Sequence, residues 1–243
     1  MKKPLALWLG CLILFIGLTL AGLHSGSRTT RSGMAAVLGS TVDGYTVVVD
    51  AGHGGEDGGA TSISGVQESQ INLEIARRTD AFLAFLGFPT KMIRESDTAI
   101  YDAAAETISE KKASDLKNRV QIANQTPGAL LVSIHQNMFE DGRYSGAQVF
   151  YAATDSSREL AERMQETLRN AVAPDNQRQV KPAETVYLMN HIQCPGILIE
   201  CGFLSNEAED LLLQDGDYQK KLALAIGVGV NGWAAEEQNE REV

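Results

Sequence analysis

Cysteine and positive charge are both scarce in this chain of 243 residues. Three cysteines, one of them in an N-terminal apolar run, are too few for a disulfide framework, so a hydrophobic core must hold the fold. The 21 Lys and Arg residues are outnumbered by 31 Asp and Glu residues, and the formal net charge is −10. Because phosphate binding requires clustered positive charge, this balance argues against a nucleic acid partner. The hydrophobic fraction of 44% and the charged fraction of 21% suit a globular domain and exclude a disordered, fibrous or polytopic membrane protein.

The longest uncharged hydrophobic run lies at the N-terminus. Lys2 and Lys3 precede Pro4–Leu23, which as a helix would span about 30 Å, enough to cross the hydrocarbon core of a bilayer. Positive charge before such a run indicates export. Residues 1–26 are therefore predicted to be a signal peptide or a membrane anchor, with the anchor favoured because the run is long, and residues 27–43 a polar tether. The rest of the chain is expected outside the cytoplasm, membrane-anchored or secreted.

Apolar runs that predict strands alternate with segments of helical spacing along the rest of the chain. Continuous apolar runs at residues 45–50, 129–135 and 196–201 suit strands buried on both faces. Shorter strands are expected at 88–93 and 146–151, helices at 71–86, 111–125, 160–168 and 218–233, and a loop or a helix at 95–112. This order predicts an α/β fold, a single three-layer αβα domain with a mainly parallel mixed sheet at 44–235, followed by a polar tail at 236–243.

Each of the three buried runs ends near a reactive side chain. His53 lies just past the first run, His135 closes the second and Glu200 lies near the end of the third. Ligands gather outside the carboxyl ends of the strands in open α/β sheets, so these residues are expected to meet at one edge. Glu68, at the start of the first predicted helix, points back over the same edge.

Two imidazoles and one carboxylate form a ligand set that suits catalytic zinc, which keeps a further coordination position open. His53, Glu68 and His135 are therefore predicted to hold one zinc ion per chain. Bound zinc acidifies water and polarises a carbonyl group. A second carboxylate can take the proton from that water and pass it to a leaving amine, and Glu200 is the candidate. A carboxylate that ends an apolar run is costly unless it is paired or lies near a metal.

Other readings of these segments have less support. The glycines around His53 permit close approach of the backbone, but they lack the Lys and the spacing of a P-loop. Cys201 has no basic neighbour in the sequence to activate it as a nucleophile. Cys194 and Cys201 are therefore expected to serve packing.

Four segments together resemble the zinc-dependent N-acetylmuramoyl-L-alanine amidases: Val48–Gly55, the helical frame that begins at Glu68, Ser133–His135 and Glu200–Asn206. They occur in the family's order, and the resemblance covers residues 46–233. Within that family, the segments 111–119, 133–137 and 144–151 are similar to the germination-specific, spore-cortex branch of endospore-forming bacteria.

The resemblance implies a hydrolase that cuts the amide between N-acetylmuramic acid and L-alanine in peptidoglycan, with His53, Glu68 and His135 as zinc ligands and Glu200 as the catalytic acid/base. Its substrate would be a glycan strand with stem peptides. The finer likeness implies a role in muramic-δ-lactam formation in spore cortex, in the forespore intermembrane space. Arg94, Arg119 and Asn137 lie in matching segments and are expected to be either substrate contacts or structural residues.

Two alternatives stay open beside this function. One is a zinc peptidase that cuts within the stem peptide, and the other is a non-catalytic cell-wall-binding regulator. The expected partners are peptidoglycan, a membrane through the N-terminal segment, and an activating protein that would help to order the site.

Overall fold

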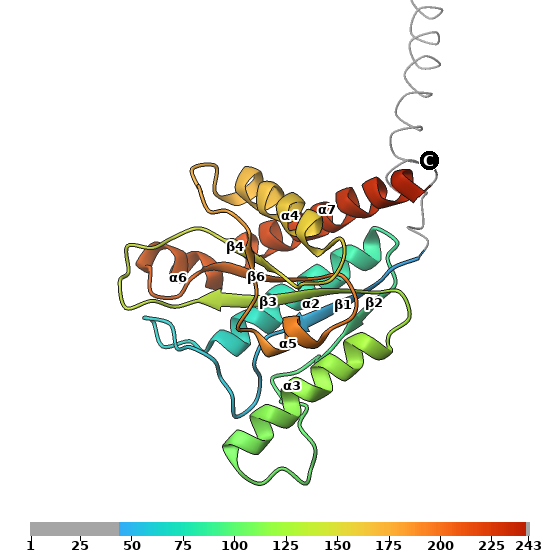
Figure 1. The fold of residues 1–243 in the computed structure, drawn as a ribbon. Helices are drawn as coiled ribbons and strands as arrows, with labels where there is room; N and C mark the ends of the chain where they lie inside the picture. The colour runs from blue at the N-terminus through green and yellow to red at the C-terminus, as the bar shows by residue number, and fades with distance from the viewer. Residues whose placement is uncertain (1–43, 242–243) are drawn as a thin grey trace, which may run out of the picture. The chain divides into compact units, whose positions relative to one another are not determined.

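The computed structural model describes residues 44–241, so the predicted anchor at 1–26 and tether at 27–43 lie outside the described residues. Along the described chain (Figure 1) the strands are β1 (Thr46–Ala51), β2 (Thr90–Met92), β3 (Ala129–Asn137), β4 (Gln148–Tyr151), β5 (Lys181–Pro182) and β6 (Gly196–Phe203). The helices are α2 (Glu68–Phe85), α3 (Ile108–Gln125), α4 (Ser157–Val172), α5 (Tyr187–His191), α6 (Glu207–Gln214) and α7 (Gly216–Arg241). Within 44–241, none of these helices is long and apolar enough to cross a membrane.

The strands form one mixed sheet in the order β2-β1-β3-β6-β4-β5. All neighbouring pairs are parallel except β4 and β6, which run antiparallel. Because β1, β3 and β6 are mutually parallel, their carboxyl ends reach the same edge of the sheet (Figure 1). This confirms the predicted α/β fold with a mainly parallel sheet.

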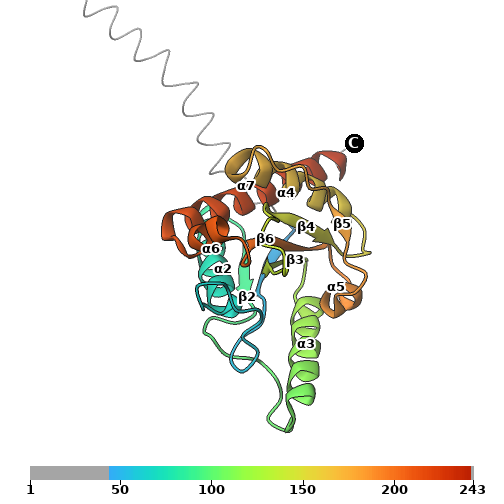
Figure 2. The ribbon, with the colours of Figure 1, turned by 90° about the vertical axis from the view of Figure 1, so that its left-hand side faces the viewer.

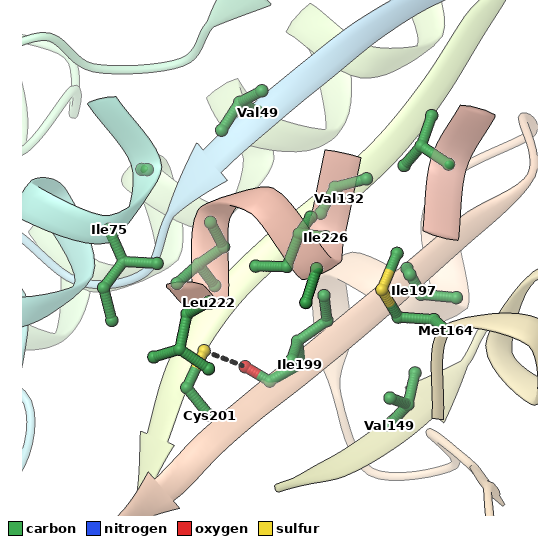
Figure 3. Close-up of a cluster of buried hydrophobic side chains, with 14 of the residues drawn as sticks. Val49, Ile75, Val132, Val149, Met164, Ile197, Ile199, Cys201, Leu222 and Ile226 are labelled. Atoms are coloured by element: carbon green, nitrogen blue, oxygen red, sulfur yellow. Dashed lines mark hydrogen bonds between the residues drawn. The ribbon is translucent and has the colours of Figure 1, made fainter. Parts of the chain in front are cut away.

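Alternate residues of the central strands enter two separate cores. Val47 and Val49 of β1 pack with α2, α4 and α7, whereas Val48 packs in a smaller cluster with α3 and α5. Figure 2 shows α4 and α7 on one side of the sheet and α3 and α5 on the other. Figure 3 shows the larger core, in which Cys201 is buried and its Sγ lies 3.9 Å from the carbonyl oxygen of Ile199. The packing role predicted for Cys201 is confirmed.

Local sequence signals set the ends of the two helices that position the site. Thr107 and Glu110 form a capping box, so α3 begins at Ile108, within the stretch expected to be a loop or a helix. Gly87, with a φ of 92°, follows α2 and allows the chain to turn into β2. The last helix, α7, continues through Arg241 into the stretch predicted as a polar tail.

Candidate active site

The three predicted zinc ligands meet at the carboxyl edge of the sheet. One potential ligand atom from each of His53, Glu68 and His135 lies within 4.8 Å of the other two. His53 Nε2 is 3.3 Å from Glu68 Oε2, and His135 Nδ1 is 3.2 Å from Glu68 Oε1. Residues from three distant segments thus direct their polar atoms at one point, as the strand ends predicted.

Two glycines make this close approach possible. A Cβ on Gly52 would lie 2.2 Å from the imidazole ring of His135, and one on Gly59 would lie 2.6 Å from Glu68 Oε2. His53 itself has a φ of 62°, a left-handed conformation that is uncommon for a residue with a side chain. Such a conformation persists only where surrounding contacts hold it.

Two buried arginines supply those contacts from beneath the loop. Arg119 donates from Nη2 to the carbonyl oxygen of His53 at 2.7 Å, and Arg94 donates from Nη2 to that of Gly52 at 3.0 Å. Arg94 also donates to Ala51, and Arg119 pairs with Asp50 at 2.5 Å. Of the two roles expected for Arg94 and Arg119, this placement supports the structural one. Asn137, the third such residue, follows His135 on β3 and its backbone carbonyl accepts from Leu204.

Glu68 is held in place by the backbone and by a buried amide. Its carboxylate accepts hydrogen bonds from the backbone N–H groups of Ala60 and Gln136 and from Asn72 Nδ2, at 3.1, 3.1 and 3.2 Å. Burial raises the pKa of Glu68, but hydrogen bonds with His135 and His53 outweigh it and hold the pKa far below its usual range. The residue therefore presents a fixed, ionised carboxylate to the site.

Asp57 orients His53, a role that the sequence reasoning missed. The Asp57 carboxylate lies 3.1 Å from His53 Nδ1, which leaves Nε2 facing Glu68. Its own position is fixed by a hydrogen bond from the Gly59 N–H and an ion pair with Lys112. A carboxylate on the outer nitrogen of a metal-binding imidazole fixes the ring and its tautomer. The signal in the sequence was the spacing of four residues from His53 within the glycine-rich loop.

Replacing Asp57 by Asn should lower zinc affinity about 10- to 100-fold, the usual cost of losing an outer-shell carboxylate. The comparison belongs at pH 9.5, where His53 is largely neutral in both proteins, with zinc buffered by a competing chelator. Glu56→Gln is the matched control, because Glu56 is exposed and pairs with Lys111 instead of His53. Equal zinc affinities for wild type and Asp57→Asn would show that Asp57 does not support zinc binding through His53.

The charge of His53 should couple zinc binding to pH. Burial lowers the pKa of His53, but Asp57 and Glu68 outweigh it and raise the pKa to about 9. Since only neutral imidazole ligates, zinc must displace about one proton from the metal-free protein at pH 7, and affinity should rise up to about pH 9. Calorimetric zinc titrations in buffers of different ionisation enthalpy measure this proton release; a pH-independent affinity without proton release would contradict it.

Glu200 lies beside the trio, on the strand next to His135. The two residues pair in register between β3 and β6. Burial raises the pKa of Glu200 to about 7, and its Oε2 is buried and accepts no hydrogen bond from residues 44–241. The donor set of His53, Glu68 and His135 fits zinc, and a buried carboxylate oxygen without a partner fits a group that exchanges a proton beside it.

The structure leaves His191 outside this constellation. His191 ends α5, where its ring stacks on Tyr187 with centroids 3.9 Å apart. The structure also argues against Cys201 as a nucleophile. Burial raises the pKa of its thiol far above the ordinary value, so the reactive thiolate does not form.

Comparisons with known proteins agree with this site. Residues 47–232 match the family model described as N-acetylmuramoyl-L-alanine amidase. The chain is 37% identical to the germination-specific N-acetylmuramoyl-L-alanine amidase of Bacillus subtilis over 78% of this chain and 79% of that protein. The amidase CwlD of Clostridioides difficile, solved in complex with the GerS lipoprotein, is 40% identical with a TM-score of 0.75, over 78% of this chain and 98% of that one. An N-acetylmuramoyl-L-alanine amidase of Clostridium difficile 630 is 32% identical with a TM-score of 0.69, over 79% and 97%.

Proposed function

This chain belongs to the N-acetylmuramoyl-L-alanine amidase family, and we propose that His53, Glu68 and His135 hold the zinc ion at which it hydrolyses the amide between N-acetylmuramic acid and L-alanine. The observation that carries the proposal is the convergence of these three side chains beside the buried carboxylate of Glu200. The substrate is peptidoglycan, and an enzyme that acts on it works outside the cytoplasm.

We assign Glu200 the proton transfers of the reaction. When bound, zinc supplies Lewis acidity, which lowers the pKa of water and polarises the scissile carbonyl. The ionised Glu200 accepts a proton from the attacking water as the new C–O bond forms, and donates it to the alanine nitrogen as the C–N bond breaks. A pKa of about 7 suits a group that must first accept and then give the same proton. The products are a free lactyl carboxyl group and a stem peptide with a free amino terminus.

We also propose that the enzyme acts on spore cortex. Support comes from its likeness to the Bacillus subtilis protein named germination-specific, and this role would require stem-peptide removal before muramic-δ-lactam forms. The similar Clostridioides difficile amidase was solved with a lipoprotein, so an extracytoplasmic lipoprotein is the proposed class of activating partner. We further propose that the enzyme works in the forespore intermembrane space and that residues 1–26 anchor it to a membrane.

Mass spectrometry of peptidoglycan digested by the zinc-loaded full-length chain tests the activity. The expected products are muramic acid with a free lactyl group and intact stem peptides that begin with L-alanine. Fragments cut within the stem peptide would support the peptidase alternative, and an unchanged digest would support a non-catalytic wall protein. For the cellular role, cortex from cells lacking this chain should contain little muramic-δ-lactam; a normal content would contradict the spore assignment.

A further inference from the structure

Three aromatic rings form a compact cluster at the end of β3, the strand that carries His135. Phe139 and Tyr144, in the loop between β3 and β4, are 51% and 48% exposed and cover Phe203, which is fully buried. The ring centroids of Phe139 and Tyr144 lie 5.8 and 6.2 Å from that of Phe203, and 5.4 Å from each other. We call Phe139, Tyr144 and Phe203 the aromatic platform. Two half-exposed rings side by side are more apolar surface than one isolated exposed side chain.

The loop that carries Phe139 and Tyr144 is held by hydrogen bonds along its length. Phe139 donates its N–H to Ser205 Oγ, the Gly142 carbonyl accepts from Asn206 Nδ2, and the Gly146 N–H donates to Glu209 Oε1. These bonds hold the backbone of the loop from which both exposed rings extend. A preorganised surface loses little conformational entropy on binding.

The platform is continuous with the catalytic edge. Gln148 of β4 lies directly opposite Glu200 in the antiparallel pair, so both side chains are on the same face of the sheet. Arg178 donates from Nη1 to Gln148 Oε1 at 3.3 Å, and its guanidinium carbon lies 4.6 Å from the ring centroid of Phe203. The loop also begins directly after β3, which carries His135, at the end of the sheet to which the β3 and β6 arrows point (Figure 1). Strand register thus places Gln148 beside Glu200, and side-chain contacts link Gln148 through Arg178 to Phe203.

The opposite side of the site has a different chemistry. There the loop after β1 meets α3 through ion pairs between Glu56 and Lys111 and between Asp57 and Lys112. We call these two ion pairs, Glu56–Lys111 and Asp57–Lys112, the charged rim. The strand order places β1 and β4 on opposite sides of β3 and β6, so the charged rim and the aromatic platform flank the zinc-ligand trio. A hollow of about 740 Å³ opens beside the platform, lined by Tyr144, Arg178 and the 172–178 segment. That volume lies within the usual range of ligand pockets.

We propose that the aromatic platform binds the glycan strand of the substrate, one or more sugar rings on the polymer side of the scissile amide. This inference rests on the proposed function. The two halves of the substrate differ as the two rims do. The GlcNAc–MurNAc backbone carries no charge where its lactyl groups are amide-linked to stem peptides, and its pyranose rings have apolar C–H faces that pack on aromatic rings. Stem peptides carry carboxylates and amines, which suit the charged rim. The stem peptide would therefore leave the zinc site toward α3, and the glycan would run toward β4.

The test is binding of a GlcNAc–MurNAc tetrasaccharide, with its lactyl carboxyl groups capped as simple amides, to the zinc-loaded full-length chain, measured by calorimetry. Phe139→Ala and Tyr144→Ala should each weaken binding roughly threefold to tenfold, with zinc content unchanged. Tyr144→Phe should bind as wild type, because the ring faces are kept. Phe85→Ala is the matched control: Phe85 is 66% exposed but ends α2, away from the carboxyl edge of the sheet.

Kinetics provide the second readout. With polymeric substrate, the Phe139 and Tyr144 alanine variants should raise KM by a similar factor and leave kcat unchanged, while a monosaccharide muramoyl-peptide should show no difference. The proposal would be overturned if wild type did not bind the tetrasaccharide, or if both alanine variants bound it with wild-type affinity. It would also be overturned if the two substitutions weakened only the binding of a protein partner. If wild type bound the tetrasaccharide through these rings but released no stem peptides, the proposed function would fail and the platform would stand.

Discussion

His135→Ala is expected to abolish zinc retention and, with it, amidase activity. His135 Nδ1 is directed at Glu68 Oε1, and both residues belong to the trio that can hold the ion within residues 44–241. Loss of a direct ligand should cost more affinity than the roughly 10- to 100-fold that an outer-shell change costs. Zinc content after dialysis, measured by atomic emission, and turnover on peptidoglycan should therefore fall together.

The matched control for this variant is His191→Ala, which removes an exposed imidazole from α5. It should keep the zinc content and turnover of wild type. If His135→Ala retained one zinc per chain with its fold intact, the proposed ligand set would be wrong.

Glu200→Gln is expected to keep zinc and lose turnover. Positioned proton transfer contributes about 10²- to 10⁴-fold to rate, so kcat should fall within that range while zinc content stays constant. Glu207→Gln, which removes one exposed carboxylate from α6, makes the same change in net charge and should leave kcat unaltered. Near-wild-type turnover by a folded, zinc-loaded Glu200→Gln enzyme would refute the assignment of Glu200.

The same substitution should stabilise the metal-free protein. Burial raises the pKa of Glu200 from its ordinary value of 4.5 to about 7, so the folded state binds more protons than the unfolded state between these values. Unfolding free energy therefore falls as pH rises from 4.5 to about 7, by about 3 kcal/mol for this group. Denaturant unfolding of zinc-free protein should show Glu200→Gln more stable than wild type at pH 8 and equal to it near pH 4. A stability difference that is independent of pH would contradict this origin.

Much of the fold was predictable because its central strands are buried on both faces. The apolar runs that became β1, β3 and β6 give an unmistakable pattern, and each ends near a polar residue of the site. Parallel pairing then brings those ends together, which is why His53, His135 and Glu200 could be placed without coordinates. Glu68 was predictable for a related reason, since it begins the helix that follows the His53 loop.

The parts that were not predictable depend on contacts between distant segments. The strand β5 and the helix α5 are too short for periodicity to mark, and α6 contains three consecutive leucines that obscure its pattern. The roles of Arg94 and Arg119 follow from which backbone carbonyls they reach, and the sequence cannot give that. The aromatic platform likewise depends on Phe203 of β6 lying beneath a loop that begins after β3.

Anomalous diffraction at the zinc edge, from crystals of the zinc-loaded full-length chain, would show which residues bind the ion. We expect one strong peak bonded to His53, Glu68 and His135, with the Glu200 carboxylate beside it but not among the ligands. A peak bonded to other residues, or an ordered site with no peak at this trio, would contradict it.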